Sequence, residues 1–215
     1  MSGPAGAPGL AAAVADARRA LADGGLALLP TDTVYGLAAA LDVPQGVAGL
    51  YALKGRPRAQ PCQVLLCAPA LLEAALAGLP EAVARAAAAL LPGPATCLVP
   101  DPAGRFAAAA GAEPGAVGLR APVLPAEFVV LDLPLVATSA NHPGEADPRR
   151  PSEVPGDLRG GVAATVDLGT LPGVASAVVD LRQVATGGPA FLVRPGPDPE
   201  ATAGALAGAG CTLKT

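Results

Sequence analysis

Cationic side chains that could bind anions stand directly after apolar segments in this 215-residue sequence. "LKGRPR" carries Lys54, Arg56 and Arg58 within five residues, and "GLRAP" places Arg120 just before Ala-Pro. Guanidinium groups form forked hydrogen bonds with carboxylates and phosphates, and lysine binds phosphate as a point charge. A fold that brings these segment ends together would form an anion-binding cleft.

Three further segments place polar groups after an apolar run. "PTDT" follows the run that ends at Leu29, "ATSAN" contains Ser139 and Asn141, and "FLVRPG" contains Arg194. Ligand pockets of open α/β sheets lie where strands end. We therefore expect these hydroxyl, amide and guanidinium groups to join the other cations at one cleft.

Each segment also has an ordinary structural explanation. Thr31 and Asp32 are common turn-forming or helix-capping residues. Arg56 and Arg58 could merely offset the dipole of a preceding helix. For either segment alone, the structural explanation is the stronger one. Lys54 is harder to explain in this way, because it is the only lysine before the C-terminal tail. The recurrence of such segments along one chain is what favours a binding site.

Helix-like and strand-like segments alternate along the chain. Apolar periodicity, glycine and proline predict helices at 10–22, 44–53, 69–77, 80–91 and 199 to about 207. Short apolar runs predict strands at 26–30, 36–41, 62–67, 96–100, 116–120, 135–139, 164–169, 176–181 and 191–194. This alternation predicts one three-layer α/β domain with a mixed sheet. The second helix should end by Leu53, so that 54–58 form a loop in which Lys54 and Arg56 share one side.

Composition argues against a membrane-spanning protein, a secreted protein and a zinc protein. Hydrophobic residues make up 52% of the chain, yet no apolar run reaches the roughly 18 residues of a membrane span. The first 20 residues lack the basic start of a signal peptide. Four cysteines without a Cys-x-x-Cys pair, and the single histidine His142, disfavour a zinc site. We expect a soluble cytoplasmic protein with reduced thiols, and loose ends at 1–8 and 208–215.

A resemblance to the YrdC-like family of threonylcarbamoyl-AMP synthases rests on seven segments in order: "LLPTDTVYGLAAAL", "LYALKGRP", "PGPATCLV", "VGLRAP", "ATSANHPG", "SAVVDL" and "LVRPG". It covers about residues 10–196, and the Lys-x-Arg and Ser-x-Asn pairs are its most specific marks. The resemblance implies a single YrdC-like domain over residues 1–215, in the short form of the family. Its fold would be a twisted mixed β-sheet flanked by helices, with a concave cleft.

The resemblance implies an L-threonylcarbamoyladenylate synthase, a nucleotidyltransferase that makes threonylcarbamoyl-AMP and pyrophosphate from L-threonine, bicarbonate and ATP. The product would pass to a downstream tRNA threonylcarbamoyl-transfer complex. Mg²⁺ would enter with ATP without a protein side chain as metal ligand, and no organic cofactor is expected. Weak RNA binding is also implied, but no membrane partner. The sequence has no G-x-x-x-x-G-K-[ST] loop, and in this family side chains hold the triphosphate instead.

The resemblance also implies roles for individual residues. Lys54 and Arg56 would be the catalytic cations. The residues that would bind L-threonine are Thr33, Arg120, Ser139 and Ser176. The residues that would bind ATP are Lys54, Arg56, Gln60, Asn141, Arg149 and Arg194. A cationic cluster suits this chemistry, because three anions must meet in one cleft and their repulsion must be offset.

Several positions depart from the family pattern. Gln60 replaces the usual asparagine, and Leu65 stands where a histidine beside the threonine is expected. Arg149 occupies a position that usually carries a hydroxyl, and Ala177 replaces a threonine. A site that hydrogen-bonds a hydroxyl discriminates strongly against analogues lacking it, whereas an apolar wall discriminates weakly. Leu65 therefore predicts a relaxed choice of amino acid.

Two other classes of function stay open from the sequence alone. One is a YrdC-like paralogue that binds double-stranded RNA without synthase activity, although the net charge of −4 argues against wide contact with a phosphate backbone. The other is a carbamoyl-handling domain like those of hydrogenase-maturation carbamoyltransferases, which lie inside much longer chains.

Overall fold

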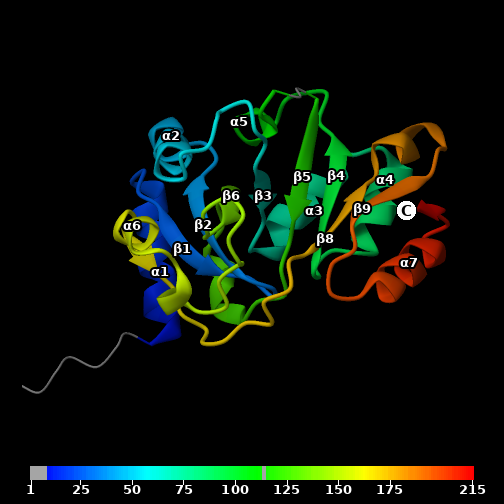
Figure 1. Ribbon diagram of the computed structural model, residues 1–215. Coiled ribbons are helices and arrows are strands. Elements are labelled where there is room, and N and C mark those ends of the chain that lie inside the picture. The colour runs from blue at the N-terminus through cyan, green and yellow to red at the C-terminus, as the bar shows by residue number, and fades with distance from the viewer. Residues whose placement is uncertain (1–8, 113–114) are drawn as a thin grey trace, which may run out of the picture.

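The computed structural model describes residues 9–112 and 115–215. Within these residues, ten strands form one mixed sheet in the order β10-β9-β8-β4-β5-β3-β6-β2-β1-β7 (Figure 1). The strands are β1 (Ala27–Pro30), β2 (Tyr35–Ala40), β3 (Gln63–Leu65), β4 (Ala95–Pro100), β5 (Ala116–Arg120), β6 (Leu135–Ser139), β7 (Ala164–Thr165), β8 (Ala177–Asp180), β9 (Ala190–Arg194) and β10 (Leu213–Lys214).

Helices connect the strands and cover the sheet. The α-helices are α1 (Leu10–Ala22), α2 (Pro44–Leu53), α3 (Pro69–Ala77), α4 (Glu81–Ala88), α5 (Ala107–Ala110), α6 (Gly156–Gly160) and α7 (Pro199–Gly208). The 3-10 helices are η1 (Ala126–Val130), η2 (Pro151–Glu153) and η3 (Arg182–Thr186). In the part of the chain that the structure describes, no helix has both the length and the apolar character needed to cross a membrane.

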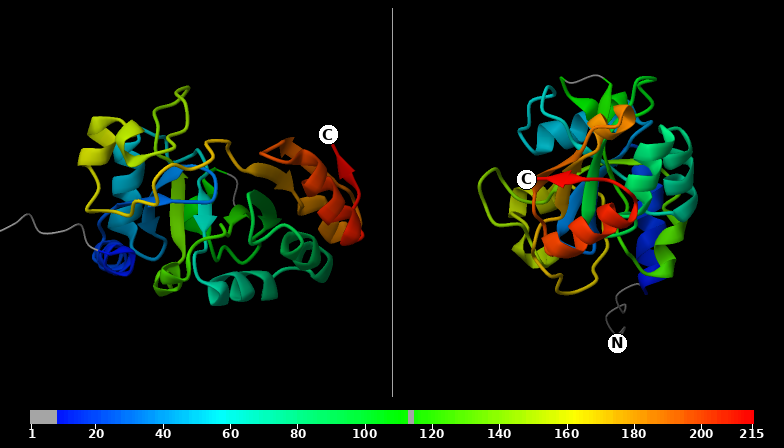
Figure 2. Two further views of the ribbon diagram at one scale, coloured as in Figure 1. Left: turned by 90° about the horizontal axis from the view of Figure 1, so that it is seen from below. Right: turned by 90° about the vertical axis from the view of Figure 1, so that its right-hand side faces the viewer.

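Two apolar clusters fill the two sides of the sheet. Val14, Ala17 and Leu21 of α1 recur at helical spacing, and pack with η1 against one face of β1, β2 and β6. The other cluster joins Val47 and Leu50 of α2 to the opposite face. Helices therefore flank the sheet on both sides (Figure 2), and the predicted three-layer α/β arrangement with a mixed sheet is confirmed.

The loop that carries the paired cations begins where the sequence predicts. Helix α2 ends at Leu53, and Lys54 is its C-terminal cap. Gly55 follows with φ of 57°, a left-handed conformation that suits glycine. The chain then leaves the helix axis, which lets Lys54 and Arg56 approach the same region.

Two expectations about the ends of elements are wrong. The predicted strand 164–169 is only two residues long, because the chain turns at Asp167 and Gly169 to bind the Tyr35 hydroxyl at 3.0 and 2.9 Å. The segment 208–215 is not a loose end: Leu213 and Lys214 pair with Ala190 and Phe191 of β9 in parallel register. The expectation for residues 1–8 lies outside the described residues.

Candidate active site

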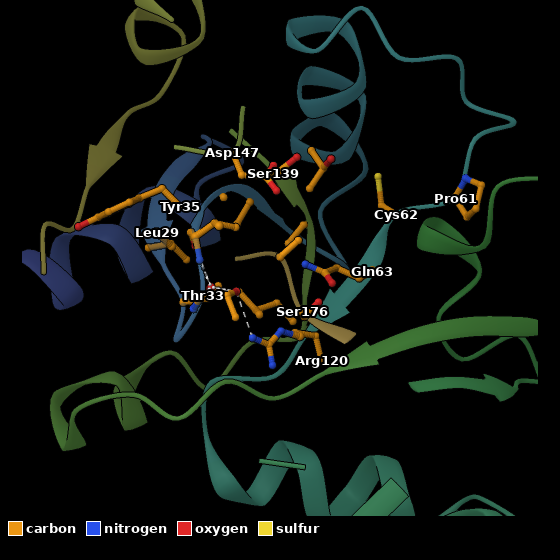
Figure 3. Close-up of a pocket in the computed structure, with 18 of the residues that line it drawn as sticks. Leu29, Thr33, Tyr35, Pro61, Cys62, Gln63, Arg120, Ser139, Asp147 and Ser176 are labelled. Atoms are coloured by element: carbon orange, nitrogen blue, oxygen red, sulfur yellow. Dashed lines mark hydrogen bonds between the residues drawn. The ribbon is translucent and has the colours of Figure 1, made fainter. Parts of the chain in front are cut away.

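A cavity of about 280 Å³ lies on the face of the sheet that carries α1, beside the α1 cluster. Its walls come from the β1–β2 turn, β3, β5, β6, the 175–176 segment and β9. Six predicted site residues line it: Thr33, Arg56, Arg120, Ser139, Ser176 and Arg194. Figure 3 shows four of the labelled side chains around one space, namely Thr33, Gln63, Arg120 and Ser176.

A second cavity of about 280 Å³ adjoins the first. The two share Arg56, Thr138 and Ser139 in their walls. The second also contains Lys54, Gln60 and Asn141. Nine of the ten predicted site residues therefore line one cavity or the other, although they come from segments spread between residues 33 and 194.

Arg149 is the predicted residue that lines neither cavity. Its Nε donates to the carbonyl oxygen of Leu171 at 3.0 Å, and its stem lies against Gly173. That glycine in turn donates its N–H to the Thr33 carbonyl at 2.9 Å. The Arg149 guanidinium thus binds the 171–173 segment behind the β1–β2 turn, and its role in ATP binding stays a prediction.

The β1–β2 turn is shaped by Thr31. Its Oγ1 accepts the backbone N–H groups of Thr33 and Val34, both at 3.1 Å, and donates to the Val34 carbonyl at 2.7 Å. This local pattern competes well with a regular strand and closes a tight turn. The structural explanation is right for Thr31. Thr33 lines the cavity, and its hydroxyl lies 2.9 Å from Thr31 Oγ1.

Arg120 is held inside the protein by several acceptors. Its side chain is 1% exposed and forms an ion pair with Asp32, which also accepts the N–H of Val123 at 3.1 Å. Further acceptors are the carbonyls of Gly93 and Ala95, the second at 3.2 Å. Burial lowers the pKa of Arg120, and the Asp32 charge opposes that shift. Arg120 lines the cavity as expected, but much of its guanidinium is already occupied.

Lys54 is also buried and bonded. Its Nζ donates to the carbonyl of Ser139 at 2.9 Å and to that of Asn141. Burial lowers the pKa of this ammonium group, and the nearby Arg56 lowers it further. An ammonium group has three donors, so one remains for a ligand in the second cavity. Lys54 thereby links the α2 loop to the Ser-x-Asn turn.

Arg56 carries a donor without a partner. Its Nη2 donates to the Pro61 carbonyl, whereas its Nε is buried and is the sole such side-chain atom without a hydrogen bond within residues 9–112 and 115–215. An unpaired buried N–H of a charged group is costly. Since Arg56 lies where both cavities meet, an anionic ligand would satisfy it.

The Ser-x-Asn turn is closed by its own side chains. Ser139 Oγ donates to Asn141 Oδ1 at 2.6 Å, and Asn141 Nδ2 donates to the Glu145 carbonyl at 2.8 Å and to Asp147 at 3.1 Å. Asp147 also reaches the first cavity. Both donors of Asn141 are therefore engaged in shaping the turn.

Three of the residues that depart from the family pattern lie in different places relative to the two cavities. Leu65 lies in the wall of the first cavity, as the selectivity argument requires. Ala177 lines neither cavity, since it is buried in β8 against Gly196. Gln60 is exposed at the rim of the second cavity.

The sequence reading missed two polar residues of the site. Gln63 of β3 lines the first cavity, and Thr96 of β4 is buried beside it, with Oγ1 3.0 Å from Gln63 Oε1. The sequence does contain a signal for both residues, because Gln63 in "CQVLLC" and Thr96 in "TCLVP" are each a polar residue inside an otherwise apolar strand. Buried polar groups of this kind need partners.

Comparison with known proteins adds three findings. Residues 19–196 match the model of the Sua5/YciO/YrdC family, described as "Telomere recombination". A Pyrococcus abyssi protein named threonylcarbamoyl-AMP synthase is 33% identical over 182 residues, which are 81% of this chain and 51% of that protein. A Chromohalobacter salexigens protein of the same name is 36% identical over 177 residues, which are 79% of this chain and 92% of that one.

A solved structure agrees with these sequence matches. The crystal structure of P. abyssi Sua5 complexed with L-threonine superposes with a TM-score of 0.76 at 27% identity, covering 95% of this chain and 58% of that chain. This chain thus spans about half the length of the Pyrococcus relative, but nearly all of the Chromohalobacter one.

Proposed function

This chain belongs to the Sua5/YciO/YrdC family, and we propose that it makes threonylcarbamoyl-AMP and pyrophosphate from L-threonine, bicarbonate and ATP. The observation that carries the proposal is the convergence of Thr33, Arg120, Ser139, Ser176 and Arg194 on one cavity, with Arg56 at its junction to a second. The similarity to a relative crystallised with L-threonine supports it further.

The amino acid lies in the first cavity, at the end formed by Thr33, Arg120 and Ser176. Arg120 and Asp32 together carry no net charge, and they face a substrate that is itself a zwitterion. Arg120 Nη2 donates to the Thr33 hydroxyl at 3.4 Å, and that hydroxyl lies 2.9 Å from Thr31 Oγ1, so a hydroxyl and a guanidinium lie side by side at this end of the cavity. Leu65 lies against the same space.

The nucleotide occupies the junction and the second cavity. Arg56 and Lys54 face the phosphates, and the unpaired Nε of Arg56 finds an anionic acceptor there. Arg194 approaches from β9, with Nε on the Ser176 carbonyl at 2.8 Å. ATP enters as its Mg²⁺ complex, with the phosphates as the metal ligands.

The reaction joins these two ends in two steps. First, the threonine ammonium and bicarbonate give a carbamate, one water and one proton. Next, a carbamate oxygen attacks the α-phosphorus, and the bond to the β-phosphate oxygen breaks with its electron pair leaving on pyrophosphate. The residues act by holding anions together and by offsetting developing charge, which requires no protein nucleophile.

The direct test is incubation with ATP, L-threonine and bicarbonate, with pyrophosphate release as one readout and mass detection of the adenylate as the other. Both signals should appear, and omission of any one substrate should abolish them. Pyrophosphate release that does not depend on L-threonine, or no adenylate at all, would overturn the proposal.

The product is a mixed anhydride, and we propose that a downstream enzyme consumes it in the cytoplasm by transferring the threonylcarbamoyl group to tRNA. The names of the relatives support the synthase over an RNA-binding paralogue without activity. The net charge of −4 also disfavours broad phosphate-backbone contact.

A further inference from the structure

A chain of hydrogen bonds runs along one wall of the first cavity. Arg194 Nη2 lies 3.2 Å from Ser176 Oγ, which lies 3.1 Å from Thr96 Oγ1, which lies 3.0 Å from Gln63 Oε1. Thr96 is buried behind the wall, while the other three reach the cavity. The direction of each bond in this chain can be deduced from the donors available.

The two ends of the chain fix its direction. A guanidinium only donates, and an amide oxygen only accepts. Thr96 must therefore give its single hydroxyl proton to Gln63, and so must accept from Ser176. Ser176 in turn donates its hydroxyl proton to Thr96 and accepts a hydrogen bond from Arg194. The protons all point from Arg194 toward Gln63, and the chain begins at a positive charge.

This direction decides what Gln63 presents to a ligand. Its amide oxygen is turned toward Thr96, so its amide nitrogen faces the opposite way, and Figure 3 shows that nitrogen on the cavity side. Among residues 9–112 and 115–215, Nε2 of Gln63 makes no hydrogen bond. Two N–H donors of fixed orientation are therefore available in the cavity.

Gly118 makes the contact between Gln63 and Thr96 possible. It lies on β5 between their strands, opposite Gln63 in the β3–β5 register. A Cβ at this position would lie 3.1 Å from Thr96 Cγ2 and 3.8 Å from Gln63 Cβ. A side chain at this position would crowd Thr96 Cγ2, so glycine leaves the most room for the two polar groups to meet across the strand.

Strand register places Gln63 midway between the two ends of the cavity. Gln63 is opposite Gly118 on β5 and Ala137 on β6. Arg120 lies two residues beyond Gly118 in one direction along the sheet, and Ser139 lies two residues beyond Ala137 in the other. The amide of Gln63 therefore faces the space between the amino-acid end and the nucleotide end.

We infer that Gln63 is a specificity-determining residue that donates hydrogen bonds to the carbamate oxygens derived from bicarbonate, and that Thr96 is the positioning residue that fixes its amide. This inference rests on the proposed function, because the carbamate is the group that links the amino acid to the α-phosphorus. It must therefore form between the two ends, where the free donors of Gln63 point.

The test compares Gln63→Glu with wild type by pyrophosphate release against bicarbonate concentration, at saturating ATP and L-threonine. Glutamate keeps an acceptor for Thr96 but replaces the donors with a negative oxygen. Loss of a hydrogen bond to a charged group predicts an apparent KM for bicarbonate raised roughly tenfold or more. Gln63→Met should raise it as well, and Thr96→Val should raise it less.

L-Threonine binding, measured by calorimetry in bicarbonate-free buffer, separates this role from a structural one. Its Kd should change by less than about threefold in Gln63→Glu, since one hydrogen bond to a charged group is worth at least tenfold. Gln183→Glu adds the same charge on exposed η3 and should match wild type throughout.

Three outcomes would overturn the inference. One is an unchanged bicarbonate KM in Gln63→Glu while wild type is active, which would leave the proposed function intact. Another is an equal rise in the L-threonine Kd, which would assign the donors to the amino acid. The third is a wild type without bicarbonate-dependent release, which would remove the proposed function and the inference together.

Discussion

The buried ion pair between Arg120 and Asp32 should contribute much more to stability than the exposed pair between Arg18 and Asp132. Arg120 and Asp32 side chains are 1% and 15% exposed, whereas Arg18 and Asp132 are 39% and 57% exposed. Both pairs join an arginine to an aspartate far away in sequence. Asp32→Asn and Asp132→Asn are therefore matched changes in two different environments.

The magnitude for Asp32→Asn follows from two lost interactions. The hydrogen bond to Arg120 loses its charge, which costs about 1.5–3 kcal/mol, and the Val123 N–H loses its acceptor, which costs about 1–3 kcal/mol. Since Asp32 keeps some contact with water, the lower values apply and the sum is about 2.5 kcal/mol. For a chain of this length, that corresponds to a fall in Tm of roughly 5–10 °C.

Urea unfolding followed by circular dichroism measures the difference. Asp32→Asn should shift the midpoint to lower urea at constant slope, and Asp132→Asn should leave it nearly unchanged, because exposed pairs contribute little. If the two variants lose equal stability, the Arg120–Asp32 pair does not hold the wall of the cavity in the manner described.

Three further predictions concern the cavities and the core. Leu65→His should sharpen the preference for threonine over serine and valine in pyrophosphate release, and an unaltered preference would show that Leu65 does not set selectivity. Lys54→Met and Arg56→Ala should each lower the rate at saturating threonine by roughly 10²-fold, and full rates in both would exclude them as catalytic cations. Burial raises the pKa of Tyr35 to about 12. An unfolded tyrosine titrates near 10, so the folded protein holds this proton more tightly. The resulting stability is complete below pH 10 and is lost as the pH rises through about 12. Urea unfolding at pH 9 and pH 11 should therefore show a smaller alkaline loss in Tyr35→Phe, and an equal loss would refute the assignment.

Much of the fold was predictable because local signals were strong. Pro44 and Gly55 bracket α2, and its bounds agree with the sequence prediction. The β1–β2 hairpin was predictable from two apolar runs around a polar turn. The early end of strand β7 and the terminal strand β10 were not, because each depends on a partner far away in sequence.

The site was predictable as a set of residues but not as a set of contacts. The resemblance supplied nine residues that line the cavities, and it gave no sign that Arg149 would lie outside both and bind Leu171 in an irregular segment. It also assigned no role to Thr96, whose contact with Gln63 arises because β4 and β3 flank Gly118. Donor direction in such a network depends on three-dimensional neighbours, which no single segment of sequence contains.

The way in which the cations are held explains how one cleft can accept two very different substrates. Lys54, Arg56 and Arg194 are positioned by main-chain carbonyls, and none forms an ion pair within 4 Å in the part of the chain that the structure describes. Carbonyl dipoles orient a cation without cancelling its charge. Of these four cations at the cavities, Arg120 is the one that is paired with a carboxylate, that of Asp32. Lys54 and Arg56 therefore keep their positive charge beside the second cavity, where a polyanionic triphosphate would lie. At the amino-acid end, Asp32 offsets the charge of Arg120 but not that of Arg194, which binds Ser176.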